Sequence, residues 1–356
     1  MEPRIKGPGL SSDSTRPARG IGADCRVGTC GGLNQTRKAI LIVFQRASWH
    51  PRWMKPAIAI VLLALMVSGC KSNESHAGGK VSPRVDWLAW QAKRKDSVSG
   101  TDGWTTLVAR HWLIEGQNFV GSNATNDLIF PRDRAPAAIG SFSRQGRAIR
   151  FEAAPGVVAT RDGLPVRSAD LDSDATNVPT RIVVGSLSFI VIERGARIGL
   201  RVRDPQAPAR LHFRGLDCFA YEPAWKLEAQ FKPFATPTTL RVQDVIGGTQ
   251  EFPSPGAVVF QYRGNEYRLD VVQEPEEDDY FVIFRDQSAG KSTYGSGRFL
   301  YVAKPDSTGR VTIDFNRAYT PPCGFTPFAT CPLPPRQNWL PFAIPAGERK
   351  PKGPHP

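Results

Sequence analysis

A group of polar side chains near the carboxyl-terminal end of the chain has the composition of a chemical site. Two carboxylates and two guanidiniums placed together can bind an anion or perform general acid–base catalysis. The group comprises Asp286, Ser288, Lys291, Tyr294, Arg298, Asp314, Asn316 and Arg317. The same charges can instead form salt bridges that hold a proline-rich tail on a sheet. We favour this structural network, and an open cleft rather than burial would indicate the catalytic alternative.

Other signals of catalysis are weak. Gly290-Lys291-Ser292 resembles the end of a phosphate-binding loop, but Arg285 stands where the first glycine should be and no helical pattern follows. His111 and His212 interrupt apolar strands, so we interpret each as a packed or surface histidine rather than a member of a Ser-His-Asp triad. No metal site and no cofactor is predicted.

An apolar stretch early in the chain has the pattern of an export signal. Ala57 to Val67 is uninterrupted and apolar, follows Met54-Lys55-Pro56, and is followed by Ser68-Gly69-Cys70. The stretch is too short to span a bilayer, which takes about 20 residues, but it fits a signal peptide. We therefore predict that the chain is cut before Cys70 and that lipid is attached to the Cys70 thiol.

The residues before this signal show no periodic pattern. Residues 1–53 are dominated by Pro, Gly, Arg and Ser, so we predict that they are an over-extended, disordered start and that Met54 begins the natural protein. Cys25 and Cys30 would then be irrelevant. The alternative is a long leader that includes the six apolar residues from Ala39 to Phe44.

The basic charge does not indicate a nucleic-acid partner. The formal net charge is +13, but residues 1–69 hold ten Lys/Arg against three Asp/Glu. Half of the excess therefore belongs to a segment expected to be absent from the mature protein. The remaining cations are scattered among strands without a continuous run, which is typical of a solvated surface.

Two cysteines in the proline-rich tail predict a cross-link. Cys323 and Cys331 enclose a nine-residue loop, and exported proteins meet an oxidising compartment. A disulfide across so small a loop would contribute about 2.5 kcal/mol. A zinc site that adds Cys218 and His212 has acceptable ligand types but lacks the spacing of a known zinc motif.

The mature chain is expected to be mainly β. A tether over 70–84 precedes a short amphipathic helix over 85–95, in which Val85, Leu88 and Ala92 share one face and Trp87 and Trp90 lie beside it. Short apolar runs broken by Gly, Asp or Pro then predict two antiparallel β units, a sandwich over 85–205 and a barrel-like sheet within 206–348. The expected strands are 105–112, 148–153, 181–184, 187–194, 197–202, 238–245, 257–262, 266–272, 280–286, 299–303 and 310–314. After Asn316 the chain is rich in proline and should wrap the surface, with a tail over 349–356.

Several motifs in the second β unit resemble a known family. They are Phe284 to Lys291, Thr293-Tyr294-Gly295, Gly297 to Leu300, Asp314 to Tyr319, Pro321-Pro322-Cys323, Thr330 to Pro335, Asn338 and Ala346-Gly347-Glu348. The sequence is similar to domain of unknown function 1684 over about Trp87 to Glu348. The resemblance implies fold and an envelope setting, but no activity.

A fainter resemblance concerns the first β unit. Phe119-Val120-Gly121, Asn126 to Ile129 and Gly185 to Ile192 are similar to forkhead-associated sandwiches, which bind phosphothreonine. Those domains place Arg after the glycine and then a Ser and His pair. Ser122 and the stretch Arg134 to Ala138 offer neither, so the resemblance implies the fold without phosphopeptide binding.

The sequence therefore predicts a lipid-anchored, mainly β protein of the cell envelope that serves as a binding or structural module. Lys71 after the lipidated cysteine favours the outer membrane in a cell with two membranes. The alternative is an envelope hydrolase or small-anion-binding enzyme that uses Asp286, Tyr294, Arg298, Asp314 and Arg317. The expected partners are the membrane, through the lipid, and an envelope ligand or protein, with no nucleic acid.

Overall fold

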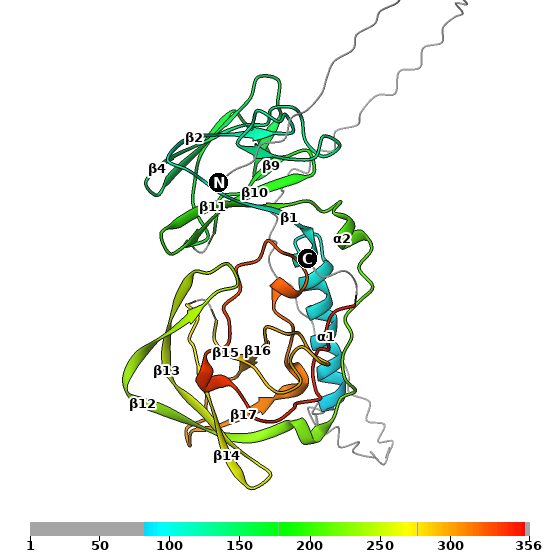
Figure 1. Ribbon diagram of the computed structural model, residues 1–356, viewed down its shortest axis with the longest axis vertical. Coiled ribbons are helices and arrows are strands. Elements are labelled where there is room, and N and C mark those ends of the chain that lie inside the picture. Colours follow the sequence, from blue (N-terminus) through cyan, green and yellow to red (C-terminus); the bar gives the residue numbers. More distant parts are fainter. Residues whose placement is uncertain (1–81, 177, 276, 353–356) are drawn as a thin grey trace, which may run out of the picture. The chain divides into compact units, whose positions relative to one another are not determined.

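The computed structural model describes residues 82–352 apart from residues 177 and 276 (Figure 1). The predicted start at Met54, the signal peptide and Cys70 lie outside the described residues. No helix in the described part of the chain is both long and apolar enough to cross a bilayer.

Strands dominate the described residues, as predicted. Eleven of them precede residue 205: β1 (Leu107–Trp112), β2 (Gly116–Gly121), β3 (Leu128–Ile129), β4 (Gly140–Gln145), β5 (Ala148–Ala153), β6 (Ala159–Arg161), β7 (Leu164–Val166), β8 (Ser168–Leu171), β9 (Ile182–Val184), β10 (Leu187–Arg194) and β11 (Arg197–Arg203). The later strands are β12 (Lys226–Gln243), β13 (Thr249–Tyr262), β14 (Asn265–Val271), β15 (Tyr280–Phe284), β16 (Arg298–Val302) and β17 (Arg310–Asp314). The helices are α1 (Pro83–Ser99) and α2 (Pro208–Leu211), with single 3₁₀ turns at Trp104–Thr106, Pro223–Trp225, Phe315–Arg317, Pro322–Gly324 and Arg336–Asn338.

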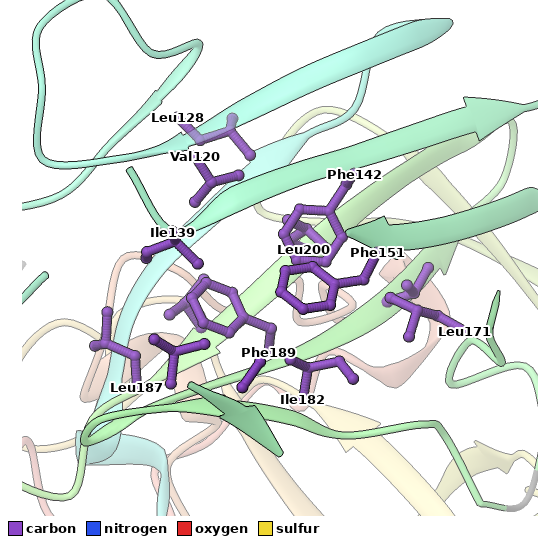
Figure 2. Packing of buried hydrophobic residues seen from close by; sticks show 14 of the residues in the cluster. Val120, Leu128, Ile139, Phe142, Phe151, Leu171, Ile182, Leu187, Phe189 and Leu200 are labelled. Atoms are coloured by element: carbon purple, nitrogen blue, oxygen red, sulfur yellow. The ribbon is translucent and has the colours of Figure 1, made fainter. Parts of the chain in front are cut away.

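The strands before residue 205 form the predicted sandwich. One sheet has the order β1-β11-β10-β9-β6-β7 and the other β3-β2-β4-β5-β8. Figure 2 shows the rings of Phe142 and Phe151, from the second sheet, meeting Phe189 and Leu200 of the first, and all four side chains are fully buried. Buried and exposed residues alternate strictly along β5, which is the period of a strand with one face on a core.

The later strands form the C-terminal sheets, which are two separate antiparallel arrangements. One sheet has the order β14-β13-β12-β17 and is open, so the predicted barrel-like sheet is not closed. In the other, β15 pairs with β16 alone. The register of β12 on β13 shifts between Pro233 and Thr238, because a proline cannot donate to the ladder and an irregularity is needed there. The rings of Trp225 and Phe260 each pack edge-on to Phe315 in the core beneath this sheet.

Helix α1 is longer than predicted and buries a different face. Ser82 caps its first turn by accepting from the Val85 amide at 3.3 Å, and Pro83 occupies the first turn, where its missing N–H costs nothing. Its buried residues are Trp87, Arg94 and Val98. The predicted apolar face was wrong, since Val85 is exposed to 54% and Leu88 to 50%.

The reason lies in the partner of α1, which is the C-terminal segment, residues 315–348, rather than the sandwich that follows in sequence. The Trp87 indole donates to the Asn316 carbonyl at 2.9 Å, and Arg94 donates to the Thr320 carbonyl at 2.7 Å. Arg94 also pairs with Glu348 at 2.8 Å. The helix therefore lies alongside this segment, drawn in orange and red in Figure 1.

The proline-rich C-terminal segment is ordered coil, held by side chains in place of a ladder. The buried Asn338 side chain accepts from the Asp270 amide at 2.7 Å and donates to the carbonyls of Asp270 and Ile283 at 2.9 and 3.0 Å. One amide thus joins the segment to both β14 and β15. All described residues belong to one compact unit.

Candidate functional site

The polar group predicted from the sequence is divided in the structure. Asp286 and Arg298 form an ion pair of 2.7 Å whose side chains are exposed to 2% and 0%. Arg298 also donates to the carbonyls of Ile344, at 3.0 Å, and Ala346. The other oxygen of Asp286 accepts from the amides of Ser288 at 2.8 Å and Ile344 at 3.2 Å. Both charged groups are therefore buried and hydrogen-bonded beneath the C-terminal segment, and only Nε of Arg298 lacks a partner among the described residues.

The local sequence explains how this pair forms. Phe284 is paired with Arg298 in the two-stranded sheet, so the residues that follow Phe284 and precede Arg298 meet at one end. Gly297 has φ of +95°, and a Cβ there would lie 2.5 Å from the Phe284 carbonyl oxygen. Only glycine allows this close approach without a shift of the backbone.

Asp314 and Arg317 form a second, more exposed group. The Asp314 carboxylate accepts from the amide and side chain of Asn316 at 3.1 and 2.9 Å and lies 3.7 Å from Arg317. Arg317 also pairs with Asp86 of α1. Within the described residues, no ion pair or hydrogen bond joins this group to Asp286 and Arg298, so the structure does not bring the four charges into one site.

The remaining members of the predicted group have separate surroundings. Ser288 is buried with its hydroxyl 2.8 Å from that of Thr293, whereas Lys291 is exposed. The Tyr294 hydroxyl donates to the Cys323 carbonyl at 3.1 Å, and burial raises its pKa. The side chains that sequence pattern placed in one cluster are therefore distributed over the scaffold.

The predicted disulfide is absent, because Cys323 and Cys331 are both free thiols. They are neighbours: the Cys323 amide donates to the Cys331 sulfur at 3.2 Å. A hydrogen bond with Cys331 lowers the pKa of the Cys323 thiol, and burial raises that of Cys331. The segment is ordered without a cross-link, since the amides of Val245 and Leu333 bond to the carbonyls of Cys331 and Gln243.

The other residues considered for chemistry also have packing roles. His111 lies edge-on to Phe130 at 5.5 Å, its Nε2 has no partner within the described part of the chain, and burial lowers its pKa. Cys218 forms an isolated bridge with Glu348, and burial raises the pKa of its thiol to about 11. Among residues 82–352, no three His, Cys, Asp or Glu side chains are grouped as metal ligands.

A cavity of about 750 Å³ lies where α1, the sandwich and the C-terminal sheets meet. This volume is within the range of about 300–1,000 Å³ typical of small-molecule sites. Its walls are Trp90, Lys93, Arg94, Ser97, Trp104, Asp174, Arg194, Arg201, Gln250, Phe252, Glu274, Phe281, Phe299, Tyr301, Tyr319, Pro322, Ala329, Thr330, Cys331 and Pro332.

Aromatic rings form one wall of this cavity. Phe281 packs against Phe299 at 4.8 Å and Tyr301 at 5.2 Å between ring centroids. Tyr319 lies nearly parallel to Tyr301, with 6.3 Å between centroids, and carries the Arg94 guanidinium above its face at 4.5 Å. Alternate positions of β16 project to one side, which places Phe299 and Tyr301 together.

Charged groups form another part of the wall. Arg194 pairs with Asp174 at 2.9 Å and donates to the Thr330 hydroxyl at 2.8 Å. The Tyr301 hydroxyl donates to Glu274 at 2.8 Å, and burial raises the pKa of Glu274. Arg201 is 8% exposed, and its Nε has no hydrogen-bond partner in residues 82–352.

Sequence reasoning singled out Cys331 among these residues, for a disulfide, and predicted no role in a cavity for any of them. They come from eight separate stretches of chain, and most look like ordinary strand or coil residues. One signal was available: Arg201 stands inside Arg197 to Arg203, a strand whose inner positions are otherwise small or apolar. A charge at a buried strand position is costly unless it has a partner or a ligand.

The C-terminal half carries a family match. Residues 211–349 match the family described as protein of unknown function (DUF1684). These residues belong to that family. The DUF1684 segment includes Glu274, Tyr301 and the Asp286–Arg298 pair, whereas Arg201 and α1 lie outside it. The resemblance that we placed from Trp87 onward is thus matched only from residue 211. A search of curated proteins finds no match.

Two solved structures resemble parts of the chain. An uncharacterized protein of Haloarcula marismortui, solved by NMR in solution, is 32% identical over 39% of this chain and 78% of its own, with a TM-score of 0.34. The FhaA FHA domain, complexed with the intracellular domain of Rv3910, is 14% identical over 26% of this chain and 97% of its own, with a TM-score of 0.20. A weak forkhead-associated neighbour therefore exists, as the sequence indicated.

Proposed function

We propose that the protein is a lipid-anchored binding module of the cell envelope whose ligand is a small organic molecule held in the 750 Å³ cavity. The observation that carries the proposal is the composition of this cavity, which joins an aromatic wall to a few fixed polar groups. That combination is typical of small-molecule sites, where apolar walls supply affinity and polar groups supply orientation.

The contacts of the predicted polar group support this function over the alternative hydrolase. A general base needs a lone pair free to accept the substrate proton. Both oxygens of Asp286 already accept hydrogen bonds. Asp314 accepts two from Asn316 at one oxygen, and its other oxygen lies 3.7 Å from the Arg317 guanidinium. The Asp286–Arg298 pair thus has the contacts of a structural element.

Binding in the cavity can be tested with the neutral fluorescent probe N-phenylnaphthylamine. We expect saturable binding to the wild type and affinity weakened about tenfold or more in Lys93→Trp, because Lys93 lines the cavity and a bulky ring there would obstruct it. Lys95→Trp is the matched control, since Lys95 is exposed on the same helix but does not line the cavity. The affinity is read from fluorescence titration.

Equal weakening in the two variants, or none in either, would contradict a cavity site. Both variants change one exposed lysine of α1 into the same residue, so differences in charge and helix propensity cancel. Circular dichroism of each variant checks that the fold is retained.

The lipid anchor rests on the order of residues from Met54 to Cys70, which combines a cation, a short apolar core, small residues and a thiol. We expect that a fatty-acid analogue fed to expressing cells labels the wild type and does not label Cys70→Ser. Gel fluorescence of the purified protein measures the label. A labelled Cys70→Ser variant would reject attachment at this thiol, and density-gradient fractionation tests the proposed outer-membrane location.

A further inference from the structure

We propose that the ligand of the cavity is a small organic anion with a flat apolar body, whose anionic group pairs with Arg201. This inference rests on the proposed binding function and names the class of ligand. It follows from a buried cation that has no ion-pair partner among the described residues, beside an aromatic wall.

Arg201 lies in the middle of β11, between neighbours in β1 and β10. Its side chain is 8% exposed and lines the cavity. Within the described residues no carboxylate forms an ion pair with it, and its Nε has no partner. The Trp104 ring lies 5.5 Å from its guanidinium carbon, which covers one face of the group but supplies no counter-charge. A buried, unpaired cation is unfavourable unless something else compensates it.

The other arginines of the wall are already neutralised. Arg94 pairs with Glu348 and Arg194 with Asp174, each within 2.9 Å. Burial and then repulsion from Arg194 lower the pKa of Arg201 to about 10, so this residue remains charged at neutral pH. The carboxylate on the wall without an arginine partner, Glu274, is bonded to the Tyr301 hydroxyl. The net attraction within the cavity is therefore for a negative group, and it is centred on Arg201.

Guanidinium chemistry and the aromatic wall together define the ligand. A planar guanidinium pairs in two-point fashion with carboxylate, sulfonate or phosphate oxygens. Phe281, Phe299 and Tyr301 offer ring faces and edges on which a flat apolar body can pack. A simple inorganic anion would pair with the guanidinium but would leave the space beside the aromatic wall unfilled.

Two probes that differ only by an anionic group test this inference. Anilinonaphthalenesulfonate carries a sulfonate on the ring system of the neutral N-phenylnaphthylamine. In the wild type we expect the sulfonate to bind more tightly. Arg201→Met should weaken the sulfonate about 10- to 100-fold, the value of a charge-assisted hydrogen bond, and leave the neutral probe unchanged. Arg197→Met is the matched control, since it removes the same charge from the same strand outside the cavity.

Arg201→Lys is a second variant, which keeps the positive charge but loses the two-point geometry of the guanidinium. Its affinity for the sulfonate should lie between that of the wild type and that of Arg201→Met. Arg201→Met should melt no lower than the wild type, because no ion pair or hydrogen bond of this side chain is lost and a buried charge is removed. Equal sulfonate affinities for Arg201→Met and Arg197→Met would overturn the anionic class while leaving the cavity site intact. If Lys93→Trp and Lys95→Trp bound the neutral probe with equal affinity, the cavity site itself would be rejected.

Discussion

Arg298→Met is expected to lower the free energy of unfolding by about 3–5 kcal/mol, because it leaves the Asp286 carboxylate buried without its counter-ion. The carbonyls of Ile344 and Ala346 lose their donors in the same variant, so the C-terminal segment loses two hydrogen bonds at once. Urea unfolding followed by circular dichroism measures the change. A linear dependence with unchanged slope would show that only stability has altered.

Arg317→Met is the matched control for this variant. Arg317 belongs to the same sequence cluster and carries the same charge, but its side chain is 32% exposed and its partners are partly solvated. A surface pair of this kind contributes about 0–1 kcal/mol. If the two variants were equally stable, Asp286–Arg298 would not be the buried structural pair that its contacts indicate.

Glu348→Gln should have a comparably large effect, about 3–5 kcal/mol, because the 1% exposed Glu348 carboxylate neutralises Arg94 and accepts from the Thr320 amide at 2.8 Å. The loss should be concentrated in the contact between α1 and the C-terminal segment. Hydrogen exchange should therefore show a greater loss of protection in α1 than in β5, which has no part in this contact.

Glu115→Gln provides the comparison for this second prediction. It removes the same charge from a pair with Arg144 in which the Glu115 side chain is 63% exposed, and it should change stability by less than about 1 kcal/mol. Uniform loss of protection throughout Glu348→Gln would contradict a local role for Glu348 and indicate general destabilisation.

Much of the fold followed from local pattern. The predicted strands at 148–153, 187–194 and 310–314 have the bounds of β5, β10 and β17. The turn at Arg263-Gly264 has an equally local cause, because both residues have positive φ and Tyr262 pairs with Asn265 across it. These elements depend on alternation and on turn residues, which a sequence displays directly.

The errors arose where distant contacts decide the outcome. The helix buries Arg94 because Glu348, far along the chain, balances its charge, and no helical periodicity indicates such a partner. The beginnings of β12 and β13 were missed because Pro233, Pro253 and Pro255 interrupt the usual strand composition. Tertiary pairing overrode local propensity at these places.

In the candidate site, too, local pattern predicted some contacts and distant contacts decided the others. Sequence proximity correctly brought Asp286 near Arg298, since both flank one pair of strands, but it also grouped Asp314 and Arg317 with them. The cavity was not predictable from neighbouring residues, because Arg201 and Tyr301 belong to different sheets and meet the same space only after folding.

The contact between α1 and the C-terminal segment also affects the order in which the parts of the protein fold during synthesis. Trp87 and Arg94 leave the ribosome long before their partners Asn316 and Glu348, and 254 residues separate Arg94 from Glu348. At about 5–20 residues per second, roughly 13–50 seconds pass before the helix can dock. The sandwich, whose core uses residues 109–202 alone, can form within that interval. Nascent chains should therefore hold a folded sandwich while Trp87 is still accessible to chaperones.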